Sequence, residues 1–105
     1  MKMFLKVLFI LTVTCLISVN MAISRPFRVS KLPDKGRTYG CATCHFNPMG
    51  GGKRNPFGQD YEKIAMPAED SYSEKLGTLN SDGDGATNDQ EFAKGTHPGD
   101  PKSKP

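Results

Sequence analysis

Two cysteines and a histidine stand together in the run Cys41-Ala42-Thr43-Cys44-His45 of this 105-residue chain. The Cys-x-x-Cys-His pattern is typical of c-type haem attachment. Two thiols at this spacing can each form a thioether to one vinyl group of the same porphyrin, and the next residue is then placed for its imidazole to reach the iron. We therefore expect Cys41 and Cys44 to bind a haem covalently and His45 to be its proximal ligand.

Other kinds of site use the same cysteine spacing. A thioredoxin-type redox motif requires a βαβ context, which this sequence does not predict. Zinc would find ligands in Cys41, Cys44 and His45, with His97 as the only other histidine, but an exported location makes thiolate zinc less usual. A structural disulfide between Cys41 and Cys44 is the simplest alternative, and it stays open beside haem.

The second axial ligand of such a haem has two candidates. Met66 precedes Pro67, as in the Met-Pro ligand loop of many small cytochromes c, although it follows His45 closely in the chain. His97 is the other candidate, whereas Met49 is too near His45 to reach the far side of the porphyrin. A Met ligand raises the reduction potential relative to two histidines, and an open position would permit the gas or peroxide chemistry of a haem enzyme or sensor. The sequence leaves all three arrangements open.

A second constellation lies nearer the C-terminus, where residues 80–91 match the twelve-residue loop of an EF-hand. Gly85 stands at the sixth position, which needs a sharp turn, and Glu91 stands at the twelfth, where it can bind calcium in bidentate fashion. The other predicted ligands are the side chains of Asn80, Asp82, Asp84 and Asn88 and the carbonyl of Ala86. A solvated Asp/Gly turn has a similar composition, but agreement at every ligand position favours calcium, with a Kd of roughly 0.1 to 1 mM.

The N-terminal residues predict export. Two lysines precede an apolar run over residues 7–18, and small residues at positions 22 and 24 fit cleavage before Arg25. We expect residues 1–24 to be a signal peptide and the mature protein to be periplasmic, extracellular or attached to the cell surface, with no integral membrane segment after cleavage. Lipidation of Cys15 is an alternative, although the small residue that lipidation usually requires beside the cysteine is missing.

Charge and size limit what the mature chain can do. Loss of Lys2 and Lys6 takes the 14 basic residues to 12 against 11 acidic ones, so no nucleic-acid-binding patch is expected. The remaining 81 residues can build only a small core, which a covalent cofactor or a metal would have to reinforce. No hydrolase constellation is present, and the haem motif predicts an electron carrier rather than an enzyme, with a haem enzyme or gas sensor as the open alternative. We expect it to work as a monomer with an unidentified redox partner protein.

Helix signals flank the two sites. Asn55 as the cap and Pro56 as the first residue predict a helix that ends by Met66, with the apolar face formed by Phe57, Tyr61, Ile64 and Ala65. Shorter helices are predicted over residues 71–76 and 88–94. The fold class is therefore mostly α, as a small, loop-rich single domain over residues 37–100, preceded by an irregular arm over 25–36 and followed by a disordered tail over 101–105. The expected apolar pocket residues are Phe46, Phe57, Tyr61 and Leu76.

Residues 37–100 resemble the temptin-like domain, which occurs in secreted animal proteins and in exported bacterial ones. The resemblance rests on the Cys-x-x-Cys-His motif, the run Gly50-Gly51-Gly52-Lys53-Arg54-Asn55-Pro56-Phe57-Gly58, and the calcium loop. It implies a calcium-containing module in which the cysteine motif packs near the glycine run, so that Arg54 can pair with a haem propionate. The leading hypothesis is an exported monohaem c-type cytochrome that carries electrons and is stabilised by calcium. The alternative is a haem-free secreted calcium-binding interaction module with a Cys41–Cys44 disulfide.

Overall fold

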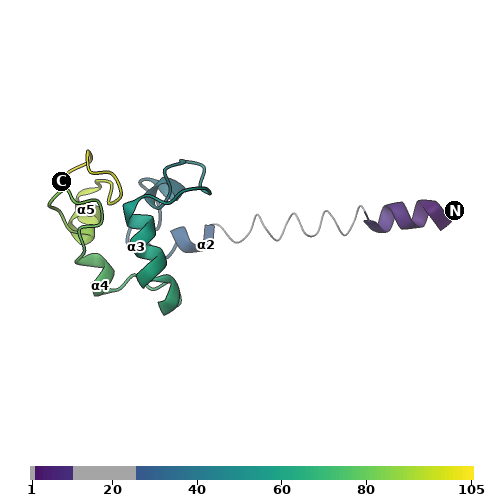
Figure 1. Ribbon diagram of the computed structural model, residues 1–105, viewed down its shortest axis with the longest axis horizontal. Helices are drawn as coiled ribbons and strands as arrows, with labels where there is room; N and C mark the ends of the chain where they lie inside the picture. The colour runs from purple at the N-terminus through teal and green to yellow at the C-terminus, as the bar shows by residue number, and fades with distance from the viewer. Residues whose placement is uncertain (1, 11–25) are drawn as a thin grey trace.

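The computed structural model describes residues 2–10 and 26–105 (Figure 1). Residues 2–10 form a helix. Within residues 26–105 the helices are α2 (Pro26–Val29), α3 (Pro56–Ile64), α4 (Glu74–Gly77) and α5 (Asn88–Lys94), with 3-10 turns η1 (Gly40–Thr43) and η2 (Met66–Ala68). The described residues contain no strand, only an antiparallel bridge between His45 and Arg54. The predicted fold class, a small domain made mostly of helices and loops, is confirmed.

The predicted signal peptide falls largely outside the described residues. Both the expected cleavage site before Arg25 and the alternative lipidation site at Cys15 belong to residues 11–25, which the structure does not describe. In the described ranges, none of the helices has the length and apolar character needed to cross a membrane.

Helix α3 begins and ends where the sequence predicts. The Asn55 side chain caps it by accepting a hydrogen bond from the Gly58 N–H at 2.9 Å, and Pro56 takes the first helical position. The helix ends at Ile64, and η2 follows, because Pro67 disfavours helical geometry in the residue before it. The result is a short, well-capped helix between the cysteine motif and the C-terminal half of the chain (Figure 1).

The core joins α3 to α4 and α5. Phe57 on α3 is fully buried, and its ring lies 5.6 Å from that of Phe92 on α5 in an edge-to-face arrangement. Phe92 makes a second edge-to-face contact, also at 5.6 Å, with Tyr72. Leu76 of α4 closes the cluster and is fully buried. The apolar face predicted for α3 is thus confirmed as the centre of the domain.

Two of the predicted segments differ from the structure. The helix predicted over residues 71–76 is confined to α4, because Ser73 is extended and the Tyr72 hydroxyl donates a hydrogen bond to Asp89 at 2.8 Å. The arm was expected to be irregular, yet it contains α2 and a run of turns, and Leu32 is only 2 % exposed in the core. Burial of Leu32 explains why the arm folds onto the domain.

Helix α5 agrees with the prediction at both ends. Thr87 and Gln90 form a reciprocal capping box at its start, and Gly95 ends it with a φ of 71°. After α5, the C-terminal residues make contacts that the sequence did not predict. Gly99 is buried beside Asn55, and the hydroxyl of Ser103 accepts a hydrogen bond from the His97 N–H at 2.9 Å.

Gly58 allows α3 to touch the cysteine motif directly. A Cβ atom at this position would lie 2.1 Å from the backbone oxygen of Cys44, far inside van der Waals contact. We expect Gly58→Ala to lower the free energy of unfolding by about 3 kcal/mol, since backbone cannot move aside as a flexible side chain would. Urea unfolding measures this, with Lys63→Ala on the exposed face of α3 as the control, expected to change stability by less than about 0.5 kcal/mol. Equal stability of the two variants would contradict the close approach.

Candidate functional site

A cleft of about 770 Å³ opens beside the cysteine motif. Its lining includes Cys41, Cys44, His45 and Met66, together with residues of α2, the glycine run and α3. This volume lies within the range of roughly 300 to 1,000 Å³ that is usual for pockets holding small molecules and cofactors. The chain therefore gathers two thiols, an imidazole and a thioether around one space.

The local backbone explains how both thiols reach the cleft. The turn η1 folds the motif back on itself, so that the N–H groups of Cys44 and His45 both donate to the Cys41 carbonyl, at 3.3 and 3.1 Å. Gly50 passes over the first thiol with a φ of 82°, and a Cβ there would lie 3.3 Å from the Cys41 Sγ. A glycine is favoured at this position by the positive φ and by the close approach.

The surroundings of Cys44 and His45 bear on what the cleft can hold. Burial raises the pKa of the Cys44 thiol to about 11, although the guanidinium groups of Arg54 and Arg28 act in the opposite direction. The thiol is therefore protonated near neutral pH and is not the reactive thiolate of a thioredoxin-type site. The Nδ1 atom of His45 is buried without a hydrogen-bond partner, which costs free energy and fits a site that another group completes.

The structure separates the two candidates for a second axial ligand. Met66 lines the cleft. His97 does not, and its Nδ1 accepts a hydrogen bond from the Gly99 N–H at 3.0 Å while its Nε2 lies 2.8 Å from the Ala42 carbonyl. Since Nδ1 is an acceptor, Nε2 carries the proton and donates to Ala42. Both nitrogens are thus engaged, and Met49 is 82 % exposed, so Met66 is the candidate that the fold brings to the cleft.

The expected apolar pocket needs a correction. Of the four residues predicted to form it, only Tyr61 lines the cleft. Phe57 and Leu76 are fully buried in the core between the helices, and Phe46 is 60 % exposed. The sequence showed that these side chains were large and apolar, but it did not show which of them line the cleft and which are enclosed in the core.

The predicted calcium loop brings oxygen atoms together. The carboxylates of Asp82, Asp84 and Glu91 each offer an oxygen atom within 4.8 Å of the others. One oxygen of each of these carboxylates, and the Oδ1 atom of Asn88, are buried with no hydrogen-bond partner. Glu91 and Asn88 are both only 1 % exposed. Four buried oxygens without donors fit a hard divalent cation, for which they are suitable ligands.

The backbone of the loop has the expected shape. The Asp84 N–H donates to the Oδ1 atoms of Asn80 and Asp82, at 3.1 and 3.2 Å, and the Ala86 N–H donates to the Asp84 carboxylate at 2.9 Å. Gly85 makes the sharp turn with a φ of 95°. Of the six predicted ligands, Asn80 is exposed, and the structure assigns its side-chain oxygen to the turn.

The carboxylates of the loop destabilise one another when no cation separates them. Burial, with help from the neighbouring Asp84, raises the pKa of Glu91 to about 7. Burial also raises the pKa of Asp82, whereas the backbone N–H of Ala86 lowers that of Asp84. Because these groups sit close together at low exposure, a divalent cation would relieve both their repulsion and their lack of hydrogen-bond donors.

Comparison with known protein families gives one match. A family model described as Temptin C-terminal matches residues 24–102. The chain belongs to this family. The match includes the cleft, the acidic loop and α2, so the temptin resemblance expected over residues 37–100 is confirmed and extends into the arm. No curated protein and no solved structure matches the chain.

In this temptin domain, the segment after α5 connects the acidic loop to the cysteine motif. Thr96 donates its hydroxyl hydrogen to the Glu91 carboxylate, and the next residue, His97, bonds to the Ala42 carbonyl. Tyr39 strengthens the junction, since its ring lies 4.4 Å from the His97 ring and its hydroxyl donates to the Gly95 carbonyl at 3.2 Å. The two candidate sites are thus parts of one connected structure.

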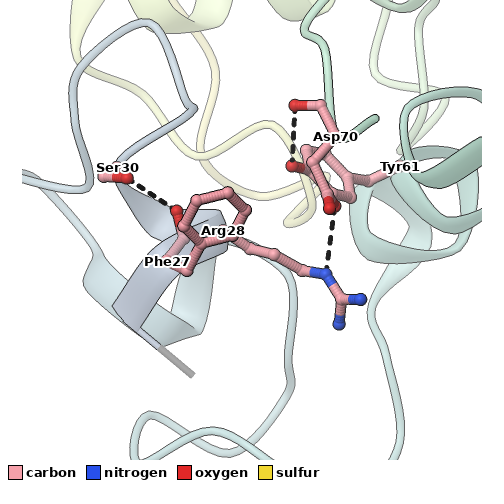
Figure 2. Close-up of polar contacts among 5 residues, drawn as sticks. All are labelled: Phe27, Arg28, Ser30, Tyr61 and Asp70. Carbon is pink, nitrogen blue, oxygen red and sulfur yellow. Dashed lines mark hydrogen bonds and ion pairs between the residues drawn. The ribbon is translucent and has the colours of Figure 1, made fainter. Parts of the chain in front are cut away.

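Sequence reasoning missed a cleft residue of the temptin domain, Arg28 of α2 (Figure 2). Its Nε donates to the Asp70 carboxylate at 3.0 Å, and the Tyr61 hydroxyl donates to the Asp70 carbonyl at 3.3 Å. These contacts fasten the arm to the end of α3. No local pattern in the sequence reveals them, because 42 positions separate Arg28 from Asp70.

Proposed function

We propose that this temptin domain is an exported monohaem c-type cytochrome that carries electrons. The observation that supports it most is the cleft at which the thiols of Cys41 and Cys44, the imidazole of His45 and the thioether of Met66 meet. A c-type haem would need such a set, with two thiols for covalent attachment and an imidazole and a thioether to bind its iron. Export, to the periplasm or beyond the cell, is part of the proposal and rests on the N-terminal pattern and on the temptin family.

Five of the residues that line the cleft would hold the haem. The thiols of Cys41 and Cys44 would hold the porphyrin through thioether bonds to its two vinyl groups. His45 and Met66 would bind the iron, and Tyr61 would form part of the wall of the site. A bound haem supplies one-electron chemistry between ferrous and ferric iron, and the protein sets its potential and its access.

Calcium has a structural role in the proposal. The ion would be held by Asp82, Asp84, Asn88 and Glu91, each of which has one buried oxygen without a hydrogen-bond partner. Because Glu91 is linked through Thr96 and His97 to the cysteine motif, bound calcium would stiffen the backbone around the thiols. In a domain with so small a core, such a metal supplies stability that apolar burial cannot.

The visible absorption spectrum tests the haem proposal. The full chain is produced in a host with a c-type maturation system, and the exported protein is then denatured and separated from non-covalent haem. We expect a haem spectrum that stays with the polypeptide, and its loss in the Cys41→Ser/Cys44→Ser double variant. A colourless wild-type protein would overturn the proposal.

A second candidate function is a haem-free secreted calcium-binding interaction module. Its support is that the acidic loop needs no haem, and that the turn η1 places Cys41 and Cys44 on the same cleft, where oxidation can join them. In that case the domain would retain its calcium dependence and lack any visible chromophore. The same spectrum therefore separates the two candidates.

The calcium proposal predicts a pH dependence. Without calcium, the raised pKa of Glu91, about 7, means that the folded state holds a proton which the unfolded state releases near pH 4.5. The stability from this proton is fully present below pH 4.5 and is lost as the pH rises to about 7. Calcium replaces the proton, so we expect the rise in melting temperature on adding calcium to be small at pH 5 and large at pH 8. An equal rise at both values would contradict the ligand role of Glu91.

A further inference from the structure

The guanidinium group of Arg28 has hydrogen-bond donors that its partner Asp70 does not use. Only Nε contacts Asp70, and Figure 2 shows the two terminal nitrogens pointing away from that carboxylate. Within residues 26–105, neither terminal nitrogen makes a hydrogen bond. Because Arg28 lines the cleft, these donors are available to a ligand there.

The backbone that presents Asp70 to Arg28 is strained. Glu69 and Asp70 both adopt left-handed conformations, with φ values of 56° and 58°, although neither is glycine. Such residues are uncommon and cluster at sites of ligand binding, where the surrounding structure holds them in place. Here the Tyr61 hydroxyl holds the Asp70 carbonyl from α3. The fold thus maintains an unfavourable turn that fixes the direction of Arg28.

Arg54 is a second guanidinium on the same cleft, from a different part of the chain. It leaves the glycine run at the bridge to His45, and its Nη1 donates to the Glu62 carboxylate at 2.9 Å. As in Arg28, only one nitrogen of the guanidinium group contacts a carboxylate. Both guanidinium groups act on the half-buried Cys44 thiol in the direction of a lower pKa, so both lie near this thiol.

We propose that Arg28 and Arg54 form a two-point binding site for a ligand that carries two carboxylates. Resting on the proposed function, this inference assigns them to the two haem propionates, one for each guanidinium. Arginine suits this task because its planar group forms paired hydrogen bonds to a carboxylate. Helix α2 is then part of the binding site, and the arm after the signal peptide is not merely a linker.

Binding of two porphyrins to the apo form of the mature protein tests this site. The probes are iron protoporphyrin IX, which has two free propionates, and its dimethyl ester, in which both charges are removed. We expect the wild type to bind the free acid roughly two- to thirtyfold more tightly than the ester, as for two partly exposed ion pairs. Arg28→Gln and Arg54→Gln should each reduce this preference, and the double variant should abolish it.

The exposed Arg37, which lies outside the cleft, supplies the matched control, and Arg37→Gln should keep the full preference. Equal binding of acid and ester by the wild type, or a preference that survives in the double variant, would overturn the site while leaving the haem proposal intact. Failure to bind either porphyrin would instead overturn the proposed function, and the site with it.

A measurement on the haem-loaded protein covers the case in which the apo variants do not fold. Each arginine favours ferrous over ferric iron by its positive charge, so Arg28→Gln should shift the equilibrium about two- to fivefold toward ferric iron, and Arg37→Gln should leave it unchanged. An unchanged potential in Arg28→Gln would contradict a role for α2 in the site.

Discussion

Glu91→Gln is expected to remove nearly all of the thermal stabilisation that calcium gives this domain. With a Kd near 0.1 mM, 10 mM calcium is a hundredfold excess and stabilises the fold by about 2.7 kcal/mol. In a domain of this size that raises the melting temperature by roughly 10–20 °C. A hundredfold loss of affinity in the variant would leave about 0.4 kcal/mol, or roughly 2–3 °C.

Glutamine keeps the shape of the buried side chain, but it has no charge and carries an NH2 group in place of one carboxylate oxygen. The variant therefore removes the bidentate ligand with little change in packing. Without calcium at pH 8, the variant should be at least as stable as the wild type, because it no longer buries a carboxylate beside Asp84. Glu74→Gln, at an exposed position on α4, is the control and should respond to calcium as the wild type does. Melting curves of the wild type that coincide with and without calcium would contradict the loop assignment.

Met66→Leu is expected to open one axial position of the haem. Leu fills nearly the same volume as Met but offers no sulfur, so the cost to stability should stay below about 1.5 kcal/mol. The reduced variant should bind carbon monoxide without denaturation, which a shift of its main absorption band reports. The reduced wild type should not bind it, because in the proposed cytochrome His45 and Met66 would both bind the iron.

Two further variants separate the possible outcomes. Met49→Leu changes an exposed methionine outside the cleft and should behave as the wild type. His97→Gln should also leave the iron closed, because His97 bonds to Ala42 and Gly99 and does not line the cleft. Carbon monoxide binding in His97→Gln but not in Met66→Leu would show that the axial assignment is wrong. Binding by the wild type would indicate a five-coordinate iron and the gas or peroxide chemistry that accompanies it.

Features that depend on nearby residues were predictable from the sequence. The cap formed by Asn55, the bounds of α5 and the turn at Gly85 all follow from interactions within about four positions. The acidic loop was also predictable from nearby residues, since its carboxylates lie within ten residues of one another. Local sequence fixes such features before the rest of the chain is placed.

Features that depend on distant contacts were not predictable. The sequence leaves His97 and Met66 level as haem ligands. The structure separates them, because Met66 lines the cleft whereas His97 is bonded to Ala42, 55 positions away. The contact of Arg28 was also not predictable, because its partner Asp70 lies in a strained turn that no residue type in the sequence indicates. Because the arm has no periodic apolar pattern, the sequence also did not predict that Leu32 is buried. Tertiary packing determines where these side chains lie. Because the core is small, the sequence has little periodic apolar pattern from which that packing can be inferred.

The intact mass of the exported protein tests the central claim most directly. The full chain is produced with a c-type maturation system, and the mature product is denatured before the mass is measured. We predict a polypeptide that begins at Arg25 and carries one haem, which would establish covalent attachment, export and the presence of a single haem together. A mass without haem and two hydrogens below that of the reduced chain would show a Cys41–Cys44 disulfide, and would contradict the cytochrome in favour of the secreted calcium-binding module.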